Sequence, residues 1–127
     1  MILENLTKSF PADRKETEGK LMYNFTLQIP TRIHFGKDTI SYLSELKEYG
    51  DKVLLVYGGG SIKKNGIYDT AMQLLKDAAL KVFERSGVEP NPRIETVRKG
   101  VAICKEEGID MVLAIGGGST IDCSKVI

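Results

Sequence analysis

The sequence predicts an α/β fold, a Rossmann-like parallel sheet with helices on both of its faces. Short apolar runs alternate along the chain with amphipathic stretches of helical periodicity. Two of the runs, residues 52–57 and 111–115, are apolar almost throughout, which is typical of parallel strands buried on both faces. Each of these two runs leads through three glycines into a further helical stretch. Strands that alternate with helices pair in parallel through crossover connections, and this order therefore indicates the fold class.

The first half of the chain contributes two strands and two helices after residue 30. Residues 31–35 predict a short opening strand that ends at Gly36. Asp38 is predicted to cap a helix that ends at Gly50. Residues 52–57 form the first buried strand. The helix after it carries apolar residues at helical spacing, namely Ile67, Ala71, Leu74, Leu75 and Ala78.

The second half repeats the pattern. Residues 81–84 predict a shorter strand. Asn91 and Pro92 are the predicted N-cap and first position of a helix that ends at Gly108. Residues 111–115 form the second buried strand. A last helix is predicted to begin at Ser119, because Ser119 and Asp122 have the spacing of a capping box.

Composition excludes several classes of partner. The 127 residues carry a formal net charge of +1, which argues against nucleic acid as the main partner. No apolar run approaches the roughly 18 residues that span a bilayer, and the N-terminus lacks the apolar core of a secretory signal. Cys104 and Cys123 lack metal-ligand spacing, and we therefore expect a reduced, cytoplasmic protein. Residues 1–21 are charged and aperiodic, which predicts a disordered extension before a domain of residues 22–127.

Two glycine turns follow the buried strands, and they are the candidate ligand-binding segments. Their sequences are Gly58-Gly59-Gly60-Ser61 and Gly116-Gly117-Gly118-Ser119. Ligands of open α/β folds bind at the carboxyl edge of the sheet, where these turns lie. Glycines let backbone N–H groups approach an anion, and the next helix adds free N–H groups and its positive dipole end. The turns predict a phosphate-containing ligand, with plain tight turns as the alternative. Neither turn has the G-x-G-x-x-G spacing, and the glycines alone do not specify a dinucleotide.

Three linked segments resemble the iron-containing (group III) alcohol dehydrogenases, and among them the butanol dehydrogenases. They are residues 57–66 (YGGGSIKKNG), residues 88–92 (VEPNP) and residues 115–119 (IGGGS), the last followed by Asp122 and Lys125. The segments have the family's order and separations, and the resemblance covers the chain from about residue 22 to its last residue. It implies the nucleotide-binding domain of a two-domain enzyme, without the helical C-terminal domain that holds iron or zinc.

The resemblance also implies where a nicotinamide cofactor binds. It places the pyrophosphate over Gly117, Gly118 and Ser119. Asn91 is implied to lie close to the cofactor, and Asp122 near the active-site cleft.

At the first turn the resemblance implies a preference for NADP(H). Gly58 stands where NAD-preferring members tend to have an aspartate, so a 2′-phosphate next to Gly58 and Gly59 meets no acid. Ser61 can donate a hydrogen bond to that phosphate, and Lys63 or Lys64 can supply positive charge. For the lysines, a solvated helix face is the alternative.

The implied activity is the interconversion of a primary, butanol-like alcohol and its aldehyde by hydride transfer, with the metal as Lewis acid. His34 is the only histidine, so the metal ligands are not on this chain, which is expected to be inactive alone. The family resemblance allows a homodimer. Two alternatives stay open: the cofactor domain of a glycerol dehydrogenase or dehydroquinate-synthase-like enzyme, and a non-catalytic flavodoxin-like binding module. Residues 57–61 and 90–92 fit the alcohol dehydrogenases better than the first alternative.

Overall fold

The computed structural model describes residues 28–127 of the chain. Residues 36–127 form one compact unit, which holds all of the helices and strands given below. The predicted extension of residues 1–21 and the predicted boundary at residue 22 lie outside the described residues. Every helix of the described part is too short or too polar to cross a lipid bilayer.

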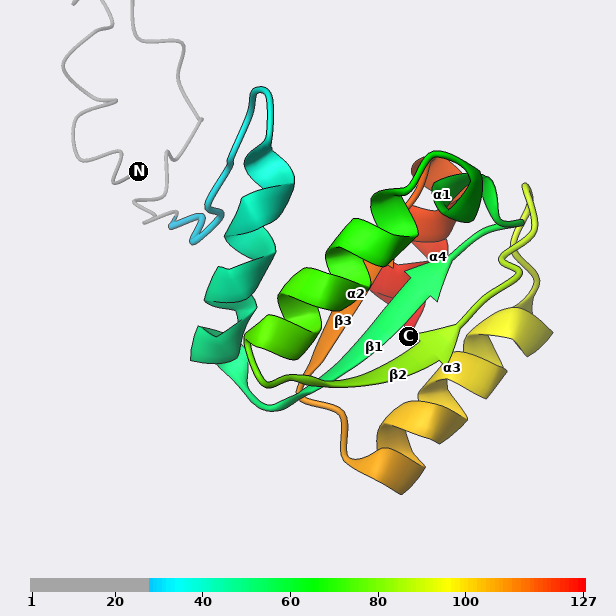
Figure 1. Cartoon of the computed structure of the whole chain (residues 1–127). Coiled ribbons are helices and arrows are strands. Elements are labelled where there is room, and N and C mark those ends of the chain that lie inside the picture. Colours follow the sequence, from blue (N-terminus) through cyan, green and yellow to red (C-terminus); the bar gives the residue numbers. More distant parts are fainter. Residues whose placement is uncertain (1–27) are drawn as a thin grey trace, which may run out of the picture. The chain divides into compact units, whose positions relative to one another are not determined.

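The centre of this unit is a sheet of three parallel strands in the order β2-β1-β3 (Figure 1). The strands are β1 (Lys52–Tyr57), β2 (Lys81–Arg85) and β3 (Met111–Ile115), in agreement with the predicted runs. β1 lies in the middle, and all of its residues from Val53 onward are buried. A central strand has partners on both sides and helices over both faces, which explains why its sequence is apolar without interruption.

Helices cover both faces of the sheet, as predicted (Figure 1). Successive residues of β1 point to opposite faces. Leu54 and Val56 pack with residues of α3 (Ile94–Glu107) and α4 (Gly118–Val126). Val53, Leu55 and Tyr57 pack on the other face. Their neighbours there come from α1 (Ser61–Lys64), α2 (Ile67–Asp77) and the helix η2 (Thr39–Tyr49). The α/β fold with a parallel sheet is therefore confirmed.

The opening strand predicted at residues 31–35 is wrong. In the structure, residues 29–35 form neither strand nor helix, and the side chains of Ile33 and Phe35 are 80% and 98% exposed. Alternation of apolar and polar residues gives a strand only where a neighbouring strand supplies hydrogen bonds and a face to bury against. Among the described residues, no strand pairs with this segment.

The first helix is present where predicted, but it is a 3₁₀ helix and Asp38 does not cap it with its side chain. Three hydroxyls each donate to a carbonyl three residues earlier: Thr39 to Gly36 (3.3 Å), Ser41 to Asp38 (2.9 Å) and Ser44 to Ser41 (3.0 Å). Such side chains compete for the backbone acceptors, and their spacing fits the tighter winding.

The helix start predicted at Asn91 and Pro92 is also wrong. α3 begins at Ile94 with Arg93 at its N-cap position, so Asn91 and Pro92 belong to the preceding loop. The carbonyl of Arg93 accepts the amides of Thr96 (3.0 Å) and Val97 (3.3 Å), which makes Arg93 the half-helical residue. The predicted end of this helix at Gly108 is confirmed, because Gly108 has a φ of 62° and closes the helix in the left-handed conformation.

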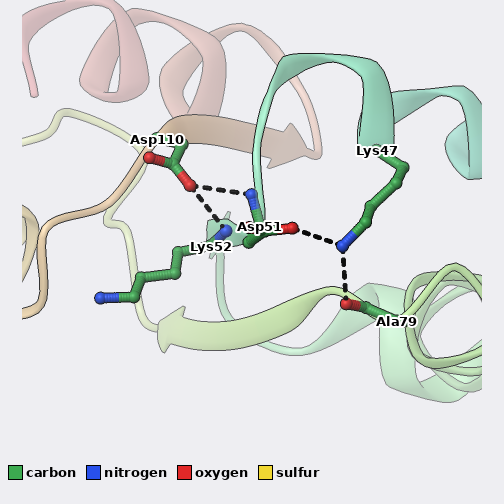
Figure 2. Close-up of polar contacts among 5 residues, drawn as sticks. All are labelled: Lys47, Asp51, Lys52, Ala79 and Asp110. Atoms are coloured by element: carbon green, nitrogen blue, oxygen red, sulfur yellow. Dashed lines mark hydrogen bonds and ion pairs between the residues drawn. The ribbon is translucent and has the colours of Figure 1, made fainter.

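Asp110 joins the amino ends of β1 and β3. Its carboxylate oxygen Oδ2 accepts the backbone amides of Asp51 (2.8 Å) and Lys52 (2.9 Å), as Figure 2 shows. These two backbone hydrogen bonds hold the pKa of the Asp110 carboxyl below its ordinary value. On the other side of Asp51, the ammonium of Lys47 contacts the Asp51 carboxylate and donates to the carbonyl of Ala79 at 3.2 Å. The contacts stabilise the edge of the sheet opposite the glycine turns.

Candidate functional site

The two glycine turns begin next to each other at the carboxyl edge of the sheet. Tyr57 and Ile115, the last residues of β1 and β3, are register partners, so the turns leave the sheet side by side. The turn after β3 favours glycine at its first position, because a Cβ on Gly116 would lie 2.6 Å from Oγ1 of the buried Thr120. A Cβ on Gly58 has more room, with the carbonyl oxygen of Val88 at 3.4 Å.

A pocket of about 460 Å³ opens at this edge. Three segments line it: Gly59 of the turn after β1, residues 87–90 of the loop after β2, and residues 117–120 at the start of α4. These segments are distant in the sequence, but each of them follows the carboxyl end of a parallel strand. The site therefore lies where open α/β sheets bind their ligands.

The pocket presents bare backbone. A Cβ added to Gly59, Gly117 or Gly118 would meet no atom within 4 Å, so a ligand can approach the main chain at these glycines. The amides of Thr120 and Ile121 already donate to the carbonyl of Gly117 at 3.1 and 3.2 Å. The first amides of a helix have no acceptor within it, which leaves the N–H groups of Gly118 and Ser119 for a ligand at the positive end of α4.

The predicted capping box at the start of α4 is not formed. Gly117 is the N-cap residue, and no side chain caps the helix. The hydroxyl of Ser119 donates instead to the carbonyl of Pro90. The carboxylate of Asp122 lies 4.0 Å from the ammonium of Lys125, and both side chains are more than 70% exposed. The box fails because Ser119 is the second residue of the helix, two positions after the N-cap, where its side chain no longer reaches the helix's own free amides.

Residues 30–127 match the family described as iron-containing alcohol dehydrogenase. This match covers most of the chain and includes both glycine turns. The chain belongs to the iron-containing alcohol dehydrogenase family.

Relatives of known name agree with the family. The chain is 64% identical over 107 residues to NADH-dependent butanol dehydrogenase B of Clostridium acetobutylicum, covering 84% of this chain and 27% of the relative. It is 44% identical over 106 residues to the NADPH-dependent aldehyde reductase YqhD of Escherichia coli, covering the same shares of the two chains. The crystal structure of NADH-dependent butanol dehydrogenase A from Thermotoga maritima has a TM-score of 0.75 and 46% identity, covering 82% of this chain and 27% of that one.

These matches confirm the resemblance and the enzyme class. The chain belongs to a family of oxidoreductases whose named relatives use NADH or NADPH. It spans only 27% of the length of those relatives.

The family's metal has no site among residues 28–127. They contain no group of three or more His, Cys, Asp or Glu side chains placed to hold a metal ion. The described residues thus do not fit an iron site. The family name points to iron, and nothing here supports zinc, which the sequence left as the other option.

The predicted site residues fall into two groups in this member of the family. Gly59, Gly117, Gly118 and Ser119 line the pocket, and the half-buried Gly58 adjoins Gly59. The other predicted residues are exposed and do not line it: Ser61, Asn91 and Asp122.

Of the two lysines considered for phosphate binding, Lys63 has other contacts. Its ammonium lies 5.3 Å from the ring centre of Tyr57 and 4.5 Å from that of Tyr68. The hydroxyls of the two tyrosines donate to the carboxylate of Glu84 at 2.7 and 2.9 Å. A hydrogen bond with the Tyr57 hydroxyl raises the pKa of Lys63 above its ordinary value. Lys63 therefore belongs to a cluster that holds α1 against β1 and β2.

The loop after β2 contributes more to the site than the sequence predicts. Residues 87–90 line the pocket, whereas the family segment 88–92 led to only one predicted site residue, Asn91. The carboxylate of Glu89 accepts the hydroxyl of Thr96 at 2.9 and 3.0 Å. Its own backbone amide and the Thr96 hydroxyl hold the pKa of Glu89 below its ordinary value. The position of the loop in the fold could have identified it as part of the site, because it follows a parallel strand and shares the edge of the sheet with both glycine turns.

Proposed function

We propose that this chain binds the diphosphate of a nicotinamide dinucleotide in the pocket at the carboxyl edge of its sheet. The observation that carries the proposal is the bare backbone: Cβ atoms on Gly59, Gly117 and Gly118 would meet nothing within 4 Å. In this proposal the amides of Gly118 and Ser119 donate to the phosphate, and the positive end of α4 favours its charge. Membership of the dehydrogenase family supports a nicotinamide dinucleotide over other phosphate ligands.

The proposed reaction is the interconversion of a primary, butanol-like alcohol and its aldehyde. The alcohol carbon gives a hydride to the nicotinamide, and the alcohol oxygen loses a proton. The residues described here contribute binding and orientation: the amides at the start of α4 hold the diphosphate, and residues 87–90 wall the pocket. Names of the relatives support this substrate class, because they include butanol dehydrogenases and an aldehyde reductase.

For the cofactor we propose NADP(H). Gly58 supports it, because no side chain there repels a 2′-phosphate and a Cβ would have only Val88 and Thr120 as neighbours. Names of the relatives point both ways: those 56–64% identical are called NADH-dependent, and those 42–44% identical are called NADPH-dependent. The ratio of the NADPH Kd to the NADH Kd of this chain tests the preference.

Three exposed residues stay in the proposal. Ser61, next to the first glycine turn, is proposed to donate to the 2′-phosphate. Asn91 follows the pocket-lining Pro90 and is proposed to lie beside the cofactor, and Asp122 to face the substrate cleft. We also propose a homodimer and a cytoplasmic location. The location is supported by Cys104 and Cys123, which are both free thiols.

Titration of the purified chain with NADPH, NADH and flavin mononucleotide tests the proposal. We expect NADPH and NADH to bind, NADPH more tightly, and the backbone amide resonances of Gly118 and Ser119 to shift most on binding. Flavin mononucleotide should leave these resonances unchanged. Failure of both nicotinamide dinucleotides to bind would refute the proposal, and tight flavin binding would favour the flavodoxin-like module instead.

A further inference from the structure

The side chain of Ser119 binds the protein itself at the mouth of the pocket. Its hydroxyl donates to the carbonyl of Pro90, 29 residues earlier in the chain. A serine hydroxyl has one proton to donate. While that proton is given to Pro90, only the backbone N–H of Ser119 remains to donate to a phosphate.

Pro90 belongs to the loop between β2 and α3, which passes over the edge of the sheet and contacts α4. It follows β2, and β2 is separated from β3 by β1. The loop crosses at the tip of β1, where the amide of Gly87 donates to the carbonyl of Gly58 and the amide of Val88 to that of Tyr57, both at 3.2 Å. These bonds fix the first part of the loop.

Beyond Val88 the loop is held by side chains. Glu89 is tied to α3 through the hydroxyl of Thr96. Pro90 has no N–H, so its carbonyl is its only backbone group that can make a hydrogen bond. The Ser119 hydroxyl binds that carbonyl and joins the middle of the loop to the helix that carries the proposed phosphate donors.

We propose that Ser119 is a positioning residue whose hydroxyl latches residues 87–91 against α4 before the nucleotide binds. The backbone and the side chain of Ser119 then have separate roles. The backbone N–H binds phosphate, and the side chain holds the pocket wall (residues 87–90) and Asn91 in place. Ordering the wall beforehand removes its entropic cost from nucleotide binding. The role in binding rests on the proposed function, whereas the latch is a property of the unliganded chain.

The latch is tested first without any ligand. Ser119→Ala removes the contact with Pro90, and Ser119→Thr keeps a hydroxyl. Ser124→Ala is the matched control, because the Ser124 hydroxyl donates to the carbonyl of Thr120 within α4 at 2.8 Å. We expect amide hydrogen exchange at Glu89 and Asn91 to rise roughly 2- to 10-fold in Ser119→Ala, the range that one hydrogen bond supports. The other two variants should exchange like the parent chain. Unchanged exchange in Ser119→Ala overturns the latch.

Measurements of ligand affinity then distinguish the role of the Ser119 side chain from that of the Ser119 backbone amide. Inorganic pyrophosphate reaches the amide donors without needing the loop, whereas NADPH also lies against the wall. In Ser119→Ala we expect the Kd of NADPH to rise roughly 2- to 10-fold. The Kd of pyrophosphate should stay unchanged, and Ser119→Thr should restore NADPH binding. Equal weakening of both ligands would show that the hydroxyl binds phosphate directly, which overturns the positioning role. If the parent chain binds neither ligand, the proposed function fails and the positioning role with it, while hydrogen exchange still decides the latch.

Discussion

Gly118→Ala separates the stability of the turn before α4 from its capacity to bind an anion. A Cβ at this position meets no atom within 4 Å, and Gly118 is the first residue of α4. Replacing glycine by alanine without strain restricts the unfolded chain and stabilises a protein by about 0.4–1 kcal/mol. For a domain of this size, 0.5 kcal/mol corresponds to a rise in Tm of roughly 2–4 °C. The new methyl group, however, stands in the open space next to the two amide donors.

The same variant should lose affinity for the dinucleotide. A phosphate displaced by the methyl group gives up at least one hydrogen bond to a charged acceptor, which contributes about 1.5–3 kcal/mol. The Kd of NADPH should then rise by about 10-fold or more, since 1.4 kcal/mol is a factor of ten. Thermal melts and fluorescence titration measure the two effects on one preparation. Ala102→Gly, at an exposed position in α3, is the opposite control: it should lower Tm by several degrees and leave the Kd unchanged. A Gly118→Ala chain that melts several degrees lower, or binds NADPH as before, contradicts the reasoning.

Three further variants test other parts of the structure. Gly116→Ala forces its Cβ to within 2.6 Å of the Thr120 hydroxyl, and overpacking of this kind should lower the free energy of unfolding by about 1–3 kcal/mol, measured in urea. Asp110→Asn should flatten the loss of Tm between pH 7 and pH 3: the folded-state pKa of Asp110 is depressed, so its contribution is present at neutral pH and is lost as pH falls through that pKa. Gly58→Asp should raise the ratio of the NADPH Kd to the NADH Kd by about 10-fold, because like charges repel at close range.

For each of these variants, one result would contradict the expected effect. An unchanged urea midpoint in Gly116→Ala would mean that the turn relaxes around the methyl group. For Asp110→Asn the contrary result is an acid-melting curve parallel to that of the parent chain. A Gly58→Asp chain that binds both dinucleotides with the parent's ratio would show that the 2′-phosphate lies elsewhere.

Sequence patterns predicted most of the fold because burial dictates them. β1 is buried from Val53 to Tyr57, and a strand with two covered faces has to be apolar throughout. Helix ends at glycine were equally readable, because Gly108 takes the left-handed conformation that only glycine adopts without cost. Helix starts were less predictable. Asn91 and Ser119 have the right chemistry for capping, but Arg93 and Gly117 hold the N-cap positions. A capping residue is decided by where its neighbours in space draw the chain, and local spacing does not contain that information.

The sequence by itself determined that buried strands end in glycine turns at one edge of a parallel sheet, because strand burial and glycine's freedom are local properties of the chain. The family motifs added the class of ligand. Only the tertiary structure decided which residues share that edge with the glycines. The strand order β2-β1-β3 carries residues 87–90 across the tip of β1 to α4, and it brings Pro90 to the hydroxyl of Ser119. That contact depends on strand order and loop path, which are settled when the whole sheet packs.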